Sequence, residues 1–143
     1  MEMNEVPTLL RGKPSWLINR ASARAHRLVG ETMAAAGGRA YHFAILAALD
    51  EFGPDSQVQI GQRCGIDQSD MNTMLNELVN KGHVARSPDP ADRRRNLVTL
   101  TAAGRRRLKH LDTRLTGAQD EILDALSASE RDTLTGLLTR ILG

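Results

Sequence analysis

The chain has 143 residues, of which 41% are hydrophobic, 25% are charged and only 3% are aromatic. This length is typical of one domain with its own core, and the apolar fraction excludes a disordered polar tail. The low aromatic content argues against a reader of single-stranded nucleic acid, which stacks bases on exposed rings. The one cysteine, Cys64, excludes an intrachain disulfide and favours a reducing cytoplasm. No apolar run reaches the ~20 residues of a membrane span, and the acidic first residues are unlike a signal peptide.

Charge is unevenly distributed along the chain. The net charge is +2, yet residues 81–110 carry nine Lys and Arg against two Asp, a local balance of +7. Residues 1–80 sum to −2 and residues 111–143 sum to −3. A basic segment between two acidic ones indicates a nucleic-acid face held by a scaffold.

The first half of the chain predicts two helices after a loose start. Residues 1–13 carry few apolar side chains in any period, so we expect them to be loosely ordered. Helical spacing begins at Pro14 and stops at Gly37-Gly38. A second helix is predicted from about Ala40 to Glu51, before the break at Gly53-Pro54.

A helix-turn-helix followed by a hairpin is predicted next. Ser56 fits the N-cap of a short helix that Gly65 ends, and Asp67 fits the N-cap of a helix that Gly82 ends. Apolar residues recur at 71, 74, 75 and 78 of this second helix. Two β-branched-rich runs, residues 84–86 and 97–100, flank a proline-containing tip with three consecutive arginines, which predicts a β-hairpin. The combination is a winged helix.

The terminal segments predict dimerisation. Thr101 fits the N-cap of a long helix with apolar residues repeating at 108, 111, 115, 118 and 122, and Ser127 with Glu130 fits a capping box for a last helix. A small winged part cannot cover these apolar stripes, whereas a second copy would bury them. We therefore expect a single domain, 1–143, that is mainly α with a small β-hairpin wing. Residues 14–36 and 101–142 would form dimerisation helices, and residues 40–100 the winged helix-turn-helix.

Two sets of side chains are candidates for contact with double-stranded DNA. Arginines suit phosphates and a narrow minor groove, and we expect Arg94 to insert, with Arg93 next. Amides and hydroxyls on the second helix of the helix-turn-helix suit base edges in the major groove, where Asn or Gln can pair bidentately with adenine. An ordinary solvated loop and helix face are the alternatives. The DNA candidates are Gln68, Ser69, Asn72, Thr73, Asn76, Arg86, Arg93, Arg94 and Arg95.

The motif Asp92-x-Arg94, followed by Leu100-Thr101 and Gly104, resembles the wing of the MarR family of bacterial transcription regulators. The resemblance covers about residues 14 to 142. It implies a homodimer that binds a pseudo-palindromic operator, most often as a repressor released by a small aromatic or lipophilic ligand. It also implies that Asp92 pairs with Arg94 and holds the shape of the wing. Members often carry a basic residue near Thr73, which is neutral here, so we expect the wing to supply more of the affinity.

Other polar residues give weaker indications. Trp16, Arg20 and His42 could line an effector pocket, because ligands of this family commonly lie near the junction of the first helix and the winged part; a tryptophan packed in the dimer interface is the alternative. Cys64 is more simply a small apolar residue than a redox sensor. The four histidines show no metal-ligand spacing, so we expect neither metal nor cofactor.

No catalytic motif is present in the sequence, so we expect a regulator and not an enzyme. The predicted function is that of a cytoplasmic, DNA-binding transcriptional regulator. Two alternatives stay open: a winged-helix module that binds only proteins, and a DNA-binding regulator without a ligand. The arginine tip favours DNA over the protein-binding module, which has no need for such a concentration of charge.

Overall fold

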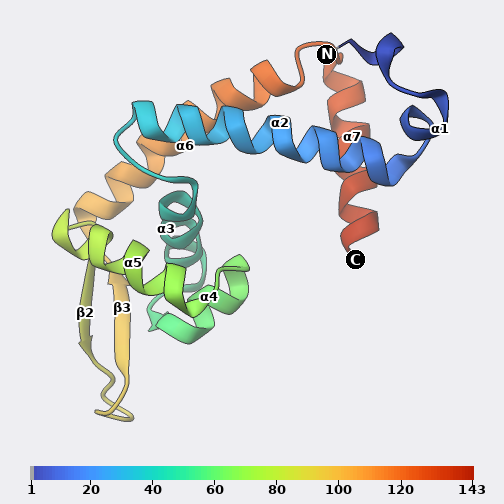
Figure 1. The fold of residues 1–143 in the computed structure, drawn as a ribbon. Coiled ribbons are helices and arrows are strands. Elements are labelled where there is room, and N and C mark those ends of the chain that lie inside the picture. Colours follow the sequence, from blue (N-terminus) through green and yellow to red (C-terminus); the bar gives the residue numbers. More distant parts are fainter. Residues whose placement is uncertain (1) are drawn as a thin grey trace. The chain divides into compact units, whose positions relative to one another are not determined.

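The computed structural model describes residues 2–143, which are mainly helical with a small three-stranded antiparallel sheet (Figure 1). The elements in chain order are a 3₁₀ turn Met3–Glu5, α1 Thr8–Arg11, α2 Pro14–Ala35, α3 Ala40–Phe52, β1 Asp55–Ser56, α4 Gln57–Cys64, α5 Gln68–Asn80, β2 Val84–Pro88, β3 Asn96–Leu100, α6 Ala102–Ile122 and α7 Ala128–Leu142. The winged helix-turn-helix predicted from the sequence is confirmed.

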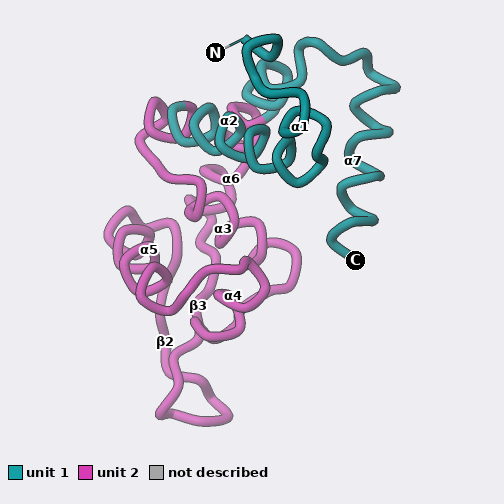
Figure 2. Tube along the Cα trace, turned by 45° about the vertical axis from the view of Figure 1, so that its right-hand side comes forward, with its two compact units in different colours: residues 1–31, 116–143 teal, residues 32–115 magenta. Residues whose placement is uncertain are grey.

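The chain forms two compact units (Figure 2). Unit 1 comprises residues 1–31 and 116–143, and unit 2 comprises residues 32–115. Unit 2 therefore contains α3, α4, α5 and the whole sheet.

The expectation of a loosely ordered N-terminus is wrong. Residues 3–5 form a 3₁₀ turn and residues 8–11 form the single turn α1. Val6 lies between them and is only 5% exposed. In the same segment, Arg11 Nη1 donates to the Met3 carbonyl at 3.4 Å. These signals are too few to produce a periodic pattern in the sequence.

Unit 2 has a closed apolar core. Ile45 and Leu46 of α3 are fully buried, as are Met71 and Leu75 of α5. Leu49 follows Leu46 by three positions, and Leu75 follows Met71 by four, so each helix buries one stripe and leaves the other face to water. Val98 of β3, 1% exposed, brings the sheet into the same core. The predicted inward face of α5 is thus confirmed.

The sheet contains a strand that the sequence did not predict. Its order is β1-β3-β2, and β1 pairs antiparallel with β3, with Asp55 opposite Val98 and Ser56 opposite Leu97. β1 has only two residues, too few to show the alternation that marks a strand. It lies directly before α4 and so joins the start of the helix-turn-helix to β3 of the hairpin.

Predicted helix starts are confirmed by their hydrogen bonds. The Ser56 hydroxyl accepts from the Gln59 amide, and Thr101 Oγ1 accepts from the Gly104 amide at 3.0 Å. Ser127 and Glu130 form the full reciprocal capping box. Such caps satisfy backbone donors that a helix cannot satisfy itself, which is why short polar patterns locate helix ends so well.

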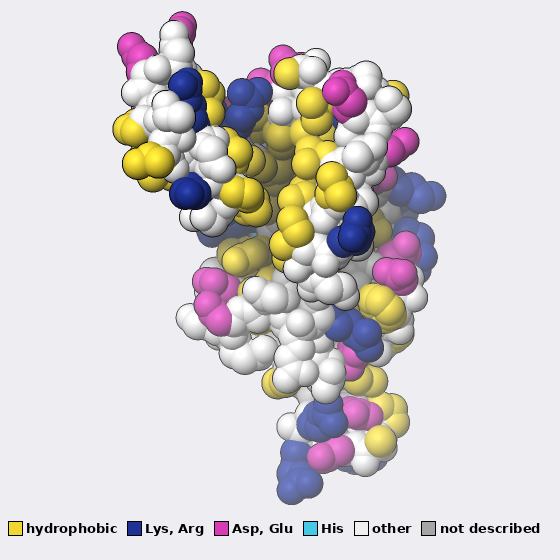
Figure 3. All heavy atoms as spheres, turned by 90° about the vertical axis from the view of Figure 1, so that its right-hand side faces the viewer, with side chains coloured by type: hydrophobic (Ala, Val, Ile, Leu, Met, Phe, Trp, Pro, Cys, Tyr) yellow, Lys and Arg dark blue, Asp and Glu magenta, His cyan; other side chains and the backbone are white. Residues whose placement is uncertain are grey.

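Unit 1 leaves much of its apolar surface uncovered. Arg24 of α2 donates to the Glu121 carbonyl of α6, and Arg131 of α7 pairs with Asp120 at 2.8 Å, so polar contacts join its helices. Large apolar side chains at least 40% exposed occur on α1, α2 and α7, as the yellow surface of Figure 3 shows. They are Leu9, Leu10, Leu17, Ile18, Leu137, Leu138, Ile141 and Leu142. No helix within residues 2–143 is long and apolar enough to cross a membrane.

Candidate nucleic-acid interface

The helix α5, called the reader helix below, presents its polar candidates on one face. Asp67 caps it, with Oδ1 accepting from the Asp70 amide at 2.8 Å. Burial of the 71, 74, 75 and 78 stripe turns the other side of the helix to solvent. The structure brings all five predicted residues to this exposed side: Gln68, Ser69, Asn72, Thr73 and Asn76.

A tight turn sets the direction of the reader helix. Gly65 ends α4 in the left-handed conformation, with φ of 68°. At Gly61, a Cβ atom would lie 2.7 Å from Gln68 Nε2 and 2.9 Å from the Ile66 carbonyl oxygen. Only glycine therefore allows α4 to approach the start of the reader helix this closely.

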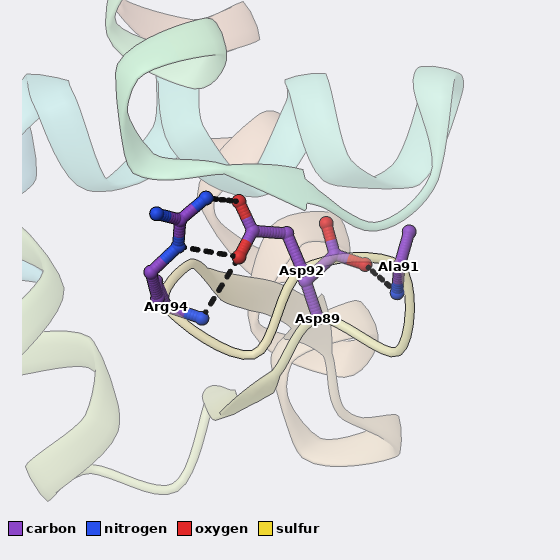
Figure 4. A network of polar contacts seen from close by, with 4 residues as sticks. All are labelled: Asp89, Ala91, Asp92 and Arg94. Carbon is purple, nitrogen blue, oxygen red and sulfur yellow. Dashed lines mark hydrogen bonds and ion pairs between the residues drawn. The ribbon is translucent and has the colours of Figure 1, made fainter.

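The wing, residues 84–100, is a hairpin whose tip is built by aspartate side chains. β2 and β3 pair in register from Val84 opposite Leu100 to Pro88 opposite Asn96. At the tip, the Asp89 carboxylate accepts from the Ala91 amide at 2.9 Å (Figure 4). The Asp92 carbonyl accepts from the Arg95 amide. Aspartates that bond the backbone two or three residues on are typical of tight turns.

Asp92 and Arg94 form the pair that the family resemblance implies. Asp92 Oδ1 accepts from both the backbone and the Nε of Arg94, and Oδ2 accepts from Nη2, so the carboxylate is held at three points (Figure 4). The side-chain hydrogen bond from Arg94 is the main cause that lowers the pKa of Asp92. The Arg94 side chain nevertheless remains 91% exposed. An exposed pair of this kind contributes little to stability, so a phosphate can compete for the guanidinium.

The side chains of Arg93 and Arg95 are exposed and make no hydrogen bond or ion pair with any of residues 2–143. Dark-blue basic side chains stand at the end of the hairpin in Figure 3, next to magenta acidic ones. The wing thus combines a shaped tip with arginines directed to solvent.

Comparison with known proteins identifies this arrangement. A model described as "MarR family" matches residues 38–95, from before α3 to the wing tip. A probable transcriptional regulator from Pseudomonas aeruginosa is 31% identical, with a TM-score of 0.82 over 92% of this chain and 98% of that one. The chain belongs to the MarR family.

Two other MarR-fold structures extend the comparison. A variant of MarR from E. coli, complexed with operator DNA, is 26% identical with a TM-score of 0.79, over 96% of this chain and 100% of that one. BpsR from Bordetella bronchiseptica, whose DNA binding is regulated by 6-hydroxynicotinic acid, is 27% identical with a TM-score of 0.80, over 99% of this chain and 96% of that one.

Several basic residues of this MarR-family chain form bonds within unit 2. Arg105 pairs with Asp50 of α3 at 2.7 Å, Arg107 donates to the Ala36 carbonyl at 2.5 Å, and Lys81 donates to the Gly37 carbonyl at 2.6 Å. Two of these bonds satisfy carbonyls at the C-terminal end of α2, where cations are favoured. The local balance of +7 therefore overstates the charge available to DNA. The sequence carries no signal that separates these cations from those of the wing.

Arg86, predicted as a DNA contact, makes a hydrogen bond within the protein. Its Nη1 donates to Asn76 Oδ1 at 2.8 Å and so connects the wing to the reader helix. The two residues are ten positions apart, and only the packing of β2 beside α5 brings them together. Both residues were predicted as DNA contacts, but the sequence does not indicate that they contact each other.

His42 lies beneath the reader helix. It is 2% exposed, and its Nε2 lies 3.6 Å from Glu77 Oε2, while Arg39 pairs with the same carboxylate at 3.1 Å. Burial lowers the pKa of His42 to about 4, although Glu77 acts in the opposite direction. His42 is therefore neutral near pH 7 and packs as a core residue of unit 2.

The other predicted effector residues lie in unit 1. The Arg20 guanidinium stacks 5.4 Å from the centre of the Trp16 ring, a cation–π contact within α2. Because Trp16 and Arg20 belong to one unit and His42 to the other, the shared pocket stays a prediction.

Cys64 is half-buried at the end of α4, and its thiol donates to the Ala44 carbonyl at 3.4 Å. Burial raises the pKa of this thiol, which lowers the fraction of reactive thiolate at neutral pH. Within residues 2–143, no group of three or more His, Cys, Asp or Glu could hold a metal ion.

Proposed function

We propose that the protein is a homodimeric transcriptional repressor that binds a specific double-stranded operator and is released from it by a small-molecule ligand. The observation that carries this proposal is the placement of two complementary surfaces in one unit. The reader helix exposes five amides and hydroxyls, and the adjoining wing exposes Arg93, Arg94 and Arg95. The operator complex of the E. coli relative supports the same use of the fold.

In this proposal the wing contacts the minor groove and its phosphates, and the reader helix contacts base edges in the major groove. Arginines at the tip of a narrow hairpin fit the electronegative minor groove and its phosphates. Amide and hydroxyl groups on a helix fit base edges in the major groove. Asp92 serves the wing indirectly, because its three bonds to Arg94 hold the tip in one shape.

Dimerisation through residues 14–36 and 101–142 is supported by the uncovered apolar side chains of unit 1. Exposed apolar patches of this kind mark interaction surfaces. On α7, Leu137, Leu138 and Ile141 recur on one helical face and are 48%, 40% and 67% exposed. A two-fold dimer would place two reader helices ~34 Å apart and so would read a pseudo-palindrome.

Release by a ligand is supported by BpsR, whose DNA binding responds to 6-hydroxynicotinic acid. Small aromatic acids are accordingly the first class to test here. Trp16 and Arg20, one aromatic and one cationic, have the chemistry to contact such a molecule, and His42 is the third residue we assign to the effector site. A cytoplasmic location follows from a role on DNA.

The proposal is tested by selecting bound sequences from a pool of random duplexes, then titrating the enriched duplex across a salt series. We expect a pseudo-palindromic sequence and an affinity that falls about 10³-fold or more between about 50 and 200 mM salt. Absence of enrichment together with a flat salt response would instead indicate a protein-binding module.

The ligand part has its own test. Small aromatic acids are screened for those that raise the melting temperature, and each hit is then added to the protein–DNA complex. A true effector stabilises the free protein and weakens DNA binding by the reciprocal factor. A compound that stabilises without changing DNA affinity is not the effector.

A further inference from the structure

The contact between Arg86 and Asn76 carries an inference about how the operator is read. Asn76 lies in the third turn of the reader helix, on the exposed face that also holds Asn72 and Thr73. Buried Met74 and Leu78 on either side of it along the helix fix the opposite face in the core, so residue 76 points outward. Arg86 lies in β2, two residues after the buried Val84. Both partners therefore project from rigid elements.

The contact gives the two ends of the Asn76 amide different roles. An asparagine amide has one carbonyl oxygen that accepts and one NH₂ group that donates twice. Arg86 Nη1 donates to the oxygen at 2.8 Å, a charge-assisted bond of ideal length. The oxygen keeps a second lone pair, but the cation draws charge from it, and the amide cannot turn it toward a base without breaking this bond. The NH₂ group is the end left for DNA.

We propose that Asn76 contacts the operator as a hydrogen-bond donor only, at a position whose partner is an acceptor, and that Arg86 is the positioning residue that imposes this orientation. This inference rests on the proposed DNA-binding function. A bidentate pair with adenine needs the amide oxygen as well, since adenine presents an acceptor and a donor in the major groove. Guanine presents two acceptors, N7 and O6, and matches a donor-only amide. A backbone phosphate oxygen is the other acceptor within the same chemistry.

The electrostatics of the reader helix agree with this role. The helix carries Asp70 and Glu77 and has no basic residue of its own. Arg86 therefore supplies a positive charge beside Asn76 that the helix lacks, and this charge disfavours donor groups on DNA and favours acceptors. With aspartate at position 76, the bond to Arg86 would persist, but an outward acceptor would replace the donor.

The test compares sequence selection by the wild type, Asn76→Ala, Asn76→Asp and Arg86→Met on random duplexes. We expect guanine at one position of the wild-type site, equal tolerance of all bases there for Asn76→Ala, and a shift toward adenine for Arg86→Met, which frees the amide oxygen. In a double-mutant cycle on the wild-type site, Arg86→Met should cost about tenfold alone and little in the Asn76→Ala background, since a positioning residue acts through its partner.

Two further measurements distinguish a base acceptor from a phosphate acceptor and check the contact in the free protein. A duplex with 7-deazaguanine at the selected position should remove the contribution of Asn76 if the acceptor is a base, whereas a methylphosphonate at one backbone position should do so if it is a phosphate. In the free protein, Arg86→Met should shift the side-chain amide resonances of Asn76, which checks the contact and the fold without DNA.

Adenine at the Asn76-dependent position of the wild-type site, with an affinity that depends on its N6 donor as well as on N7, would overturn the inference, because the amide oxygen would then accept. Independent, additive losses for the two variants would overturn it too, because Arg86 would then contact DNA for itself. Either result leaves the protein a DNA-binding regulator. Failure of the wild type to enrich any duplex overturns the proposed function and this inference together.

Discussion

The reader helix and the wing hold their functional side chains by opposite means. The reader helix is fixed by four buried apolar residues and carries two acidic and no basic side chains. The wing carries four arginines and two aspartates, and exposed hydrogen bonds from its aspartate side chains to the backbone help to shape its tip. The core thus fixes the position of the reader helix, and the hairpin supplies the positive charge. In the proposed function, base recognition and the charge that holds DNA are therefore divided between two elements of unit 2.

The strongest way to break the comparison is to remove the core beneath the reader helix. Met71 is completely buried, so Met71→Ala should lower the free energy of unfolding by about 2–5 kcal/mol through lost burial and a residual cavity. Chemical denaturation measures this loss. The matched control is the exposed neighbour Asn72→Ala, which should change stability by no more than about 0.5 kcal/mol. Equal effects from the two substitutions would show that the helix is not held by its buried face.

Acid should loosen the support of the reader helix while the protein remains intact at neutral pH. The pKa of His42 is about 4 in the fold, against 6.5 for an exposed histidine, so the unfolded chain binds the proton more readily. Its contribution to stability is fully present above about pH 6.5 and is lost as the pH falls toward about 4, by about 3 kcal/mol at most.

Denaturation curves between these pH values measure the effect, and His42→Gln is the control that should flatten the pH dependence. Burial also lowers the pKa of His83, which changes stability in the same direction, so a residual slope is expected in the control. A protein whose stability rises on acidification through this range would contradict the neutral, buried His42.

The junction between the reader helix and the wing can be disturbed at Gly104. A Cβ atom there would overlap the backbone carbonyl of His83, and Thr101 bonds the same turn by donating from Oγ1 to the Gly82 carbonyl at 2.7 Å. Gly104→Ala should therefore destabilise unit 2 by about 1–3 kcal/mol. Gly117, on the same helix α6, has open space around it, so Gly117→Ala should be neutral or stabilise by up to about 1 kcal/mol. Thermal unfolding of both variants would decide, and a harmless Gly104→Ala would contradict the tight junction.

Local patterns predicted most of the fold. Apolar residues with a 3.6-residue period predict each long helix. The side chains of Ser56, Asp67 and Ser127 each cap a helix by accepting from the backbone amide three residues ahead. Features that depend on few residues were missed. β1 has two residues, and α1 is a single turn, so neither is long enough to show a period.

The sequence analysis named the candidate side chains of the site but not the contacts between them. The polar face of the reader helix follows from the position of its apolar stripe, and the Asp92–Arg94 pair is local in the sequence. By contrast, the bond from Arg86 to Asn76 and the bonds that tie Lys81, Arg105 and Arg107 to the scaffold depend on tertiary packing. The sequence does not distinguish an arginine exposed on the wing from one that bonds a backbone carbonyl, as Arg107 does.

The most direct test of whether the wing supplies phosphate contacts and the reader helix supplies base contacts is the salt dependence of binding to the selected operator. Arg94→Ala should lower affinity for all duplexes alike and reduce the slope of log K against log salt by about 1, because one phosphate contact is lost. Asn72→Ala should leave this slope unchanged and weaken discrimination between operator and unrelated duplex by about 1–3 kcal/mol. Arg114→Ala, on α6, controls for the loss of one positive charge outside the wing. An unchanged slope for Arg94→Ala, or an equal fall for Arg114→Ala, would contradict the wing as the element that grips DNA.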